Sequence, residues 1–231
     1  MNKKNKLIAL SVLSAMSLTS VSPLAINSFS NVIALQGDQT VNKGTVVMNQ
    51  DTTIKYLDTN TDPADGTQAK DKWGQYTGWT RTYKDGDNAS LNGQYTDNEW
   101  KEQTGEFSTE KGTLNKTSRA YFFRGYFNVD QASAVNGIHL SFNYKDAVIV
   151  YINGQQLTAW NVPDEGYRSQ DGGNGNHKDN MGYGSKETSS SVKTADLYFR
   201  DIKDMLTNGK NVIAFEIHKS NETSEGYFKL N

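Results

Sequence analysis

The residues best suited to contact a ligand lie together in one stretch of the chain, between residues 160 and 183. They are Trp160, Tyr167, Arg168, Asp171, His177, Asp179 and Tyr183. An aromatic ring can stack on the apolar face of a sugar, while Asp, Arg and His side chains hydrogen-bond its hydroxyl groups. The pattern therefore predicts a carbohydrate-binding loop. The alternative is a disordered, glycine-rich loop in which Trp160 packs on the fold as an anchor.

A second group of polar residues has the spacing of cation ligands. Side-chain oxygens recur at alternate positions at Asp58, Asn60 and Asp62. Calcium prefers such oxygen ligands, but an EF-hand loop needs glycine at its sixth position and glutamate at its twelfth. This chain has Pro63 and Ala69 at those positions. The run therefore predicts either a cation-binding loop or a turn rich in Asp and Asn.

Other conspicuous side chains are expected to support the fold. Trp73, Tyr76 and Trp79 lie within seven residues. They could form another aromatic platform, but packing at the edge of the core is the simpler expectation. Arg124 should project from a strand towards a carboxylate, and Glu216 is its expected mate in a structural ion pair.

The sequence contains no recognisable catalytic constellation. Its three histidines, His139, His177 and His218, show no metal-ligand spacing, and there is no cysteine. Neither a Gly-x-Ser-x-Gly nucleophile elbow nor a phosphate-binding loop occurs. We therefore expect a protein that is not an enzyme.

Residues 1–34 have the pattern of a secretory signal peptide. Three lysines among the first six residues form a basic start, and an apolar run broken by small serines follows over residues 7–18. The run is too short for a stable membrane span. We expect cleavage near Ala34, a flexible mature N-terminus over 35–44, and a secreted protein that is not inserted in the membrane. An uncleaved anchor is the alternative.

The composition favours strands and tight turns. Aromatic residues make up 11% of the chain, which has 20 glycines and only 3 prolines. Because there is no cysteine, packing alone must hold an exported fold together. A net charge of −2 without a basic patch argues against nucleic acid as a partner.

The hydrophobic pattern places the strands. Asn153-Gly154 predicts a type I′ hairpin turn that joins the apolar run 147–152 to a partner strand at 155–157. Because 147–152 is apolar on both faces, it should be central in its sheet. Further strands are expected at 45–48, 52–57, 120–129, 138–144, 195–200, 212–217 and 227–230, with a helical turn at 201–206. About eight main strands and one short helical turn predict an all-β, antiparallel two-sheet sandwich of the jelly-roll kind, as one domain over 45–231.

With those strands placed, the chain resembles the galactose-binding-like jelly-roll modules found beside secreted bacterial metallophosphoesterases and other surface enzymes. The motifs that carry the resemblance are 54–58 (IKYLD), 97–103 (DNEWKEQ), 121–127 (YFFRGYF), 146–154 (DAVIVYING) and 211–218 (NVIAFEIH). The resemblance extends over nearly all of the mature chain, with the motifs in the same order. Two departures are Ala147, which replaces a glycine of the family pattern, and the long glycine-rich loop after Pro163.

The resemblance implies the fold and an accessory or adhesive role, without identifying a sugar. Jelly rolls of this kind often hold a structural calcium ion between an early loop and the last strands. The resemblance therefore implies one Ca²⁺, with Asp58, Asp62 and Glu216 as its ligands.

Together these observations predict a secreted, non-catalytic module that binds carbohydrate or serves as an adhesive at the cell surface. One alternative is the N-terminal accessory domain of a secreted calcineurin-like metallophosphoesterase whose catalytic part is not in this sequence. The other is a purely structural surface protein.

Overall fold

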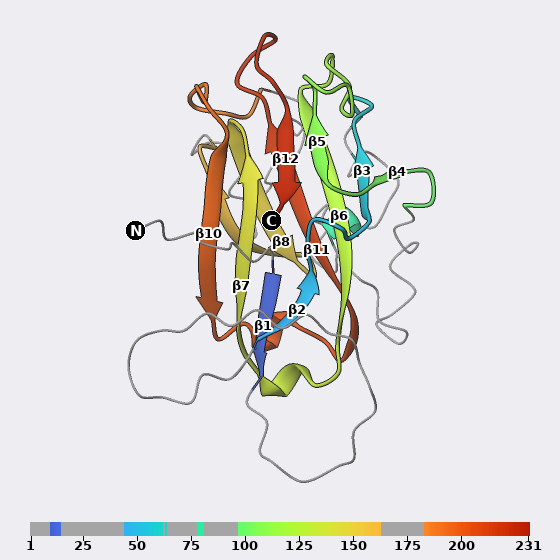
Figure 1. Cartoon of the computed structure of the whole chain (residues 1–231), viewed down its shortest axis with the longest axis vertical. Helices are drawn as coiled ribbons and strands as arrows, with labels where there is room; N and C mark the ends of the chain where they lie inside the picture. The colour runs from blue at the N-terminus through green and yellow to red at the C-terminus, as the bar shows by residue number, and fades with distance from the viewer. Residues whose placement is uncertain (1–9, 15–43, 62, 64–77, 81–96, 163–182) are drawn as a thin grey trace, which may run out of the picture.

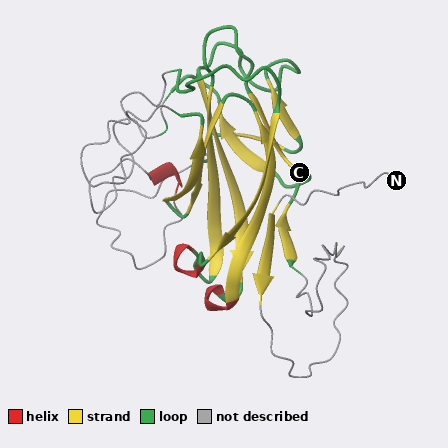
Figure 2. Ribbon diagram, turned by 90° about the vertical axis from the view of Figure 1, so that its left-hand side faces the viewer, coloured by secondary structure: helices red, strands yellow, loops and turns green. Residues whose placement is uncertain are grey.

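The fold is known from a computed structural model, which describes residues 10–14, 44–61, 63, 78–80, 97–162 and 183–231. These residues form two antiparallel β-sheets packed face to face (Figures 1 and 2). The all-β, two-sheet sandwich expected from the sequence is thus confirmed.

Each sheet has six strands. The first, sheet A, has the order β2-β1-β7-β12-β5, and β10 pairs with β7 as well. Its strands are β1 (Leu10–Ser14), β2 (Thr45–Met48), β5 (Glu106–Ser108), β7 (Val135–Tyr144), β10 (Lys193–Arg200) and β12 (Tyr227–Leu230). The second, sheet B, has the order β4-β3-β6-β11-β8-β9. Its strands are β3 (Ile54–Leu57), β4 (Lys101–Gln103), β6 (Ala120–Val129), β8 (Ala147–Ile152), β9 (Gln155–Trp160) and β11 (Gly209–His218).

Helical structure in the described residues is confined to short 3₁₀ turns. These are η1 (Gly78–Thr80), η2 (Ala132–Ala134) and η5 (Lys203–Met205), and the last lies within the helical turn expected at 201–206. None of the helices in this part of the chain is long and apolar enough to cross a membrane.

The Asn-Gly turn joins β8 to β9 as the sequence predicts. Asn153 has φ 47° and Gly154 has φ 85°, so both central residues lie in the left-handed region that a type I′ turn requires. The Asn153 side chain also accepts a hydrogen bond from the backbone N–H of Val212 and donates one to Asn211. The turn is therefore fixed to the start of β11.

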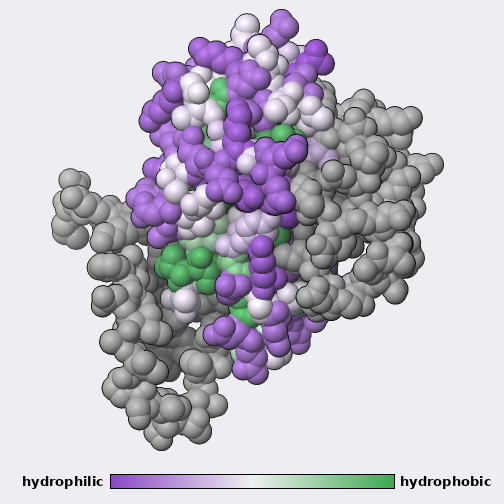
Figure 3. Space-filling model, turned by 90° about the vertical axis from the view of Figure 1, so that its right-hand side faces the viewer, coloured by the Kyte–Doolittle hydropathy of each residue, from purple (hydrophilic) through white to green (hydrophobic). Residues whose placement is uncertain are grey.

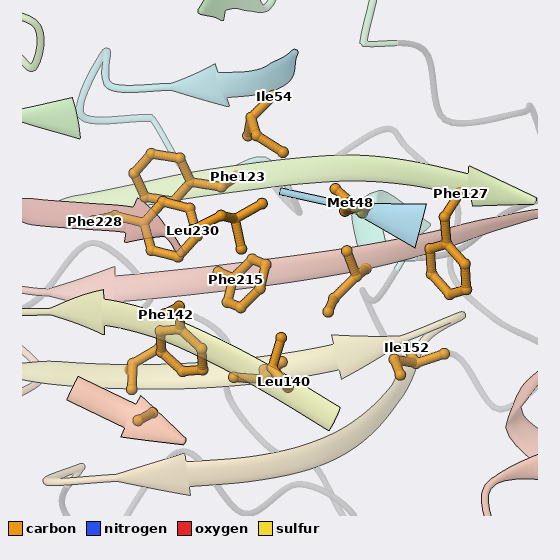
Figure 4. Packing of buried hydrophobic residues seen from close by; sticks show 14 of the residues in the cluster. Met48, Ile54, Phe123, Phe127, Leu140, Phe142, Ile152, Phe215, Phe228 and Leu230 are labelled. Atoms are coloured by element: carbon orange, nitrogen blue, oxygen red, sulfur yellow. The ribbon is translucent and has the colours of Figure 1, made fainter. Parts of the chain in front are cut away.

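The main core lies between the two sheets (Figure 4). Alternate residues of β6 and β11 point into it, and among them Phe123 and Phe215 both pack against Phe228 of β12, with ring centroids 4.5 and 4.6 Å apart. This alternation follows from the period of two along a strand. Phe142 of β7 meets Phe215 edge to face at 5.2 Å, so the rings of both sheets interlock.

The outer face of sheet B carries a second apolar layer, which we call the outer cluster. Its buried members are Trp79, Trp100, Ala120, Phe122, Ile149, Tyr151, Val212 and Ala214. Trp79 in η1 meets Phe122 and Tyr151 edge to face at 5.2 and 5.8 Å. This layer explains why β8 is apolar on both faces although it is not the central strand: it lies between β11 and the outermost strand β9.

The described surface on one side of the sandwich is mainly polar. On the side where β3 and β4 lie, hydrophilic residues cover most of the described surface, and the hydrophobic areas are small (Figure 3).

Part of the expected signal peptide appears in the sheet. Of residues 1–34, only Leu10–Ser14 is described, and it forms β1 between β7 and β2. The cleavage site at Ala34 and the mature N-terminal residues 35–43 lie outside the described residues. Secretion and cleavage therefore stay predictions.

Candidate functional site

The long loop after β9 leaves from one end of the sandwich, where β3, β7, β9 and β11 also end. Trp160 is the last residue of β9 and is half-buried. Its ring stacks on Tyr144 at 6.1 Å with an interplanar angle of 26°, and it lies 6.1 Å from Phe142. The indole thus packs against residues of the main core, as an anchoring tryptophan would.

Asn161 joins the two ends of that loop. It has φ 56°, a conformation that Asn tolerates better than most residues. Its side chain accepts a hydrogen bond from the N–H of Glu187 at 3.2 Å and donates to the carbonyl of Glu187 at 2.7 Å. The N–H of Lys186 donates to the Asn161 carbonyl at 2.9 Å. A single asparagine therefore forms the base of the loop.

Asp146 connects this base to two neighbouring loops. It lies in the β7–β8 turn with φ 62°, and its side chain is buried. The carboxylate accepts hydrogen bonds from the backbone N–H groups of Ser189 at 2.6 Å and Ser220 at 2.8 Å. Its carbonyl accepts from Asn161 at 3.2 Å. Since N–H donors satisfy the buried charge, Asp146 serves to hold three loops together.

Lys219, beside Ser220, is a buried cation at the same end. Its ammonium donates to the carbonyls of Lys116 and Glu222 at 3.0 and 3.2 Å. Burial lowers the pKa of Lys219, although the charges of Asp146 and Glu222 act in the opposite direction. This lysine crosslinks the loops before β6 and after β11.

Most of the predicted ligand-binding residues cannot be placed. Tyr167, Arg168, Asp171, His177 and Asp179 lie outside the described residues, so their role stays a prediction. Tyr183 is described, and the guanidinium of Arg119 lies over its ring, 5.1 Å from the centroid. The structure does not show Tyr183 in contact with Trp160.

The predicted calcium ligands have protein partners. Asp58 is buried and accepts hydrogen bonds from the Lys101 ammonium, 2.8 Å from Oδ1, and from the backbone N–H of Asn115. Glu216 lies 2.6 Å from Nε2 of His218 and accepts from the hydroxyl of Tyr151. Asp62 is not among the described residues. Within the described part of the chain, no group of three or more His, Asp or Glu side chains could hold a metal ion. Calcium binding stays a prediction.

Arg124 is buried, but its ion-pair partner is Asp97 and not the expected Glu216. Nε of Arg124 lies 3.0 Å from Oδ2 of Asp97, which also accepts from the hydroxyl of Tyr126. Burial alone would raise the pKa of Asp97, but the Tyr126 hydrogen bond and the charges of Arg124 and Lys55 together lower it. In the sheet, Arg124 pairs with Ala214, while Glu216 pairs with Phe122.

Of the possible aromatic platform, only Trp79 is described. It is buried in the outer cluster, 6.2 Å from Trp100, so its ring is a packing element. Trp73 and Tyr76 lie outside the described residues.

An exposed aromatic residue that the sequence analysis did not single out lies on the outer face of sheet A. Tyr198 of β10 is 45% exposed and is one of two exposed large hydrophobic residues in the described part of the chain. Its ring lies over Gly137 of β7: a Cβ at that glycine would be 2.9 Å from the Tyr198 hydroxyl. The absence of a side chain on Gly137 lets the phenol rest on the sheet.

Polar groups surround this ring. The Arg200 guanidinium is 5.6 Å from the ring centroid, and Asp196 pairs with Nε2 of His139 on the adjacent strand. The buried Nδ1 of His139 has no hydrogen-bond partner among the described residues. We call Tyr198, Arg200, Asp196 and His139 the Tyr198 face. The sequence pattern could have identified this face. Alternation along β10 places Asp196, Tyr198 and Arg200 on one face of the strand and Ala195, Leu197 and Phe199 on the other.

Comparisons with known proteins find similarity only at the level of solved structures. No protein-family model matches the chain, and no curated protein matches it. A β-glucuronidase from glycoside hydrolase family 2 matches with 14% identity and a TM-score of 0.35, over 74% of this chain and 13% of that chain. A β-glucuronidase from Ruminococcus gnavus in complex with D-glucuronic acid matches with 12% identity and a TM-score of 0.37, over 83% of this chain and 24% of that chain.

The chain therefore spans a quarter or less of the length of these two solved structures. These two structures do not support the expected association with metallophosphoesterases.

Proposed function

We propose that the chain is a secreted, non-catalytic β-sandwich module that binds carbohydrate through the Tyr198 face. The observation that carries this proposal is the Tyr198 ring, which rests on Gly137 and remains 45% exposed. Its hydroxyl and its apolar ring offer a sugar both a polar and a stacking contact.

The neighbouring charges suit the hydroxyl groups of a sugar. Arg200 offers several donors in a planar fork, and the Asp196 carboxylate offers acceptors. The side chain of Asp196 is 47% exposed, so its oxygens can reach a ligand while one of them contacts His139. Loop 160–183, whose base Asn161 holds, is proposed as a further contact surface of the same module.

The non-catalytic role is supported by the state of the buried acids. Asp58, Asp97, Asp146 and Glu216 are all buried, and each is bound by protein donors or cations. Such groups stabilise the fold, whereas a glycosidase needs two carboxyl groups that flank a substrate bond. A purely structural surface protein is the competing proposal, and glycan binding separates the two.

The test is a glycan array followed by calorimetry on the best ligand. Tyr198→Ala removes the ring and should weaken binding about tenfold or more, because stacking and the hydroxyl contact are both lost. Tyr198→Phe keeps the ring and should bind within a few-fold of the wild type. Val192→Ala, at an exposed residue outside the Tyr198 face, is the matched control. A wild type that binds no glycan, or a Tyr198→Ala variant that binds equally well, would contradict the proposal.

A further inference from the structure

Strand β1 lies in a slot between two other strands of sheet A (Figure 1). On one side Leu10 pairs with Leu140 and Val12 with Ile138 of β7. On the other side Leu10 pairs with Met48 of β2. We call the space between residues 135–140 of β7 and strand β2 the β1 lane.

Residues 10–14 also belong to the apolar run expected to be removed as a signal peptide. Cleavage near Ala34 would leave both walls of the β1 lane in the exported chain but take away the strand between them. β12 covers only the other part of this edge of β7, from Phe142 to Tyr144. The edge at 135–140 would then present unpaired backbone groups, which readily accept another strand.

In sheet A, β2 pairs only with β1, but it also has a contact that does not depend on β1. Met48 is buried in the main core, and its side chain lies against Gly125 of β6 in the opposite sheet. Because this contact comes from across the core, Met48 can keep it when β1 is absent. The open edge of β7 at 135–140 is the wall that remains in the sheet through its pairing with β10.

The chain's own mature N-terminus is a poor replacement for β1. Residues 35–43 contain only two aliphatic side chains, Leu35 and Val41, among polar residues and glycine. The positions opposite Leu140 and Ile138 lie on the inner face, since both of those residues are buried in the main core. An occupant therefore needs apolar residues two positions apart, as β1 has.

We propose that the exported protein binds an extended segment of a partner polypeptide in the β1 lane by β-strand addition. The segment runs antiparallel to β7, with alternate apolar residues at the positions opposite Leu140 and Ile138. It lies in line with β12, because the backbone N–H of Asn231 already donates to the carbonyl of Ser141, one residue before the lane begins. The partner is thus a strand donor of defined direction and pattern.

The experiment uses protein exported from a bacterial host that carries the full sequence. Mass spectrometry should show that residues 1–34 have been removed. The probe is a synthetic peptide of residues 8–16 with a charged solubility tag. Its addition should slow hydrogen exchange in residues 45–48 and 135–140 about tenfold or more, and leave residues 142–144 unchanged.

The control peptide carries Val12→Pro, which removes a backbone donor and should abolish this protection. The Tyr198→Ala protein should bind the probe as well as the wild type, which separates this site from the Tyr198 face. Retention of residues 1–34 in the exported protein would overturn the proposal. So would equal binding of both peptides, slow exchange in 45–48 without any peptide, or a dimer that fills the lane with a second copy.

Discussion

The side-chain amide of Asn161 pairs with the backbone of Glu187 in both directions, as a neighbouring strand would. Glu187 N–H donates to Oδ1 at 3.2 Å, and Nδ2 donates to the Glu187 carbonyl at 2.7 Å. Just after the end of β9, a side chain thus forms the pair of hydrogen bonds that a neighbouring backbone would form. The two ends of a long loop are held together without a disulfide.

Removal of this amide should open the loop base. Asn161→Ala is expected to cost about 1–3 kcal/mol of unfolding free energy, since the backbone of Glu187 and the carbonyl of the buried Asp146 lose their hydrogen bonds. Asn161→Gly accepts the positive φ and also lacks the amide, so a similar loss in both variants would assign the effect to the amide. Urea denaturation measures the loss. Stabilities equal to that of the wild type would contradict the role of Asn161.

Trp160 should contribute to stability because its ring packs on Tyr144 and Phe142. Trp160→Ala is expected to cost about 2–3 kcal/mol, and Trp160→Phe clearly less, because a ring is retained. Thermal or urea denaturation checks this. If Trp160→Ala has the stability of the wild type but loses glycan binding, the ring acts as a ligand platform instead.

Asp146 should be the most sensitive polar residue of the loop end. Asp146→Ala leaves the N–H groups of Ser189 and Ser220 without their acceptor and is expected to cost about 3 kcal/mol. Asp146→Asn keeps one oxygen and tolerates φ 62°, so its loss should be smaller. The order of the two denaturation midpoints is the test, and a reversed order would count against the proposed hydrogen bonding.

Asp97 should make the fold sensitive to acid. Its pKa is lowered in the folded state, so its contribution is fully present above the pKa of the unfolded carboxyl, about 4. The contribution is lost as the pH falls through the folded-state value. Asp97→Asn should therefore be less stable than the wild type at pH 7, and the difference should shrink as the solution is acidified towards pH 3. Parallel stability curves for the two proteins would show that Asp97 does not supply this pH dependence.

Gly125 should not accept a larger residue while Met48 keeps its position. A Cβ at Gly125 would be 2.2 Å from Cε of Met48 and 3.0 Å from Cδ1 of Ile54. Gly125→Ala is expected to cost about 1–3 kcal/mol through overpacking. Because the nearest atom ends a flexible side chain, Met48→Leu should recover part of the loss. A double-mutant cycle measures the coupling, and strictly additive effects would rule out this contact.

The strands were predictable because alternation and apolar runs report burial directly. β6 and β8 match the expected ranges residue for residue, and Asn153-Gly154 forms the expected hairpin turn. β7, β9 and β11 extend beyond the expected ranges because their ends pair with neighbouring strands that a single-strand pattern does not reveal.

The partner of Arg124 was not predictable from strand patterns. Asp97 precedes the short strand β4, in a stretch without periodicity, so nothing in the sequence places it above β6. Glu216 appeared suitable because it lies on the same face as Arg124, but the register puts it opposite Phe122. Tyr198, in contrast, could have been recognised from the alternation of β10. The contact between Tyr198 and Gly137 could not be predicted in this way, because it depends on the register between β10 and β7.

The tryptophans of the described residues lie in two separate apolar layers, so their fluorescence can report on each layer. Trp79 and Trp100 lie in the outer cluster, whereas Trp160 packs on the opposite side of sheet B. In a Trp73→Phe protein, emission from Trp79 and Trp100 should therefore report on the outer cluster and emission from Trp160 on the main core. A protein that sheds its outer layer before the sandwich opens would show two steps in fluorescence where circular dichroism shows one.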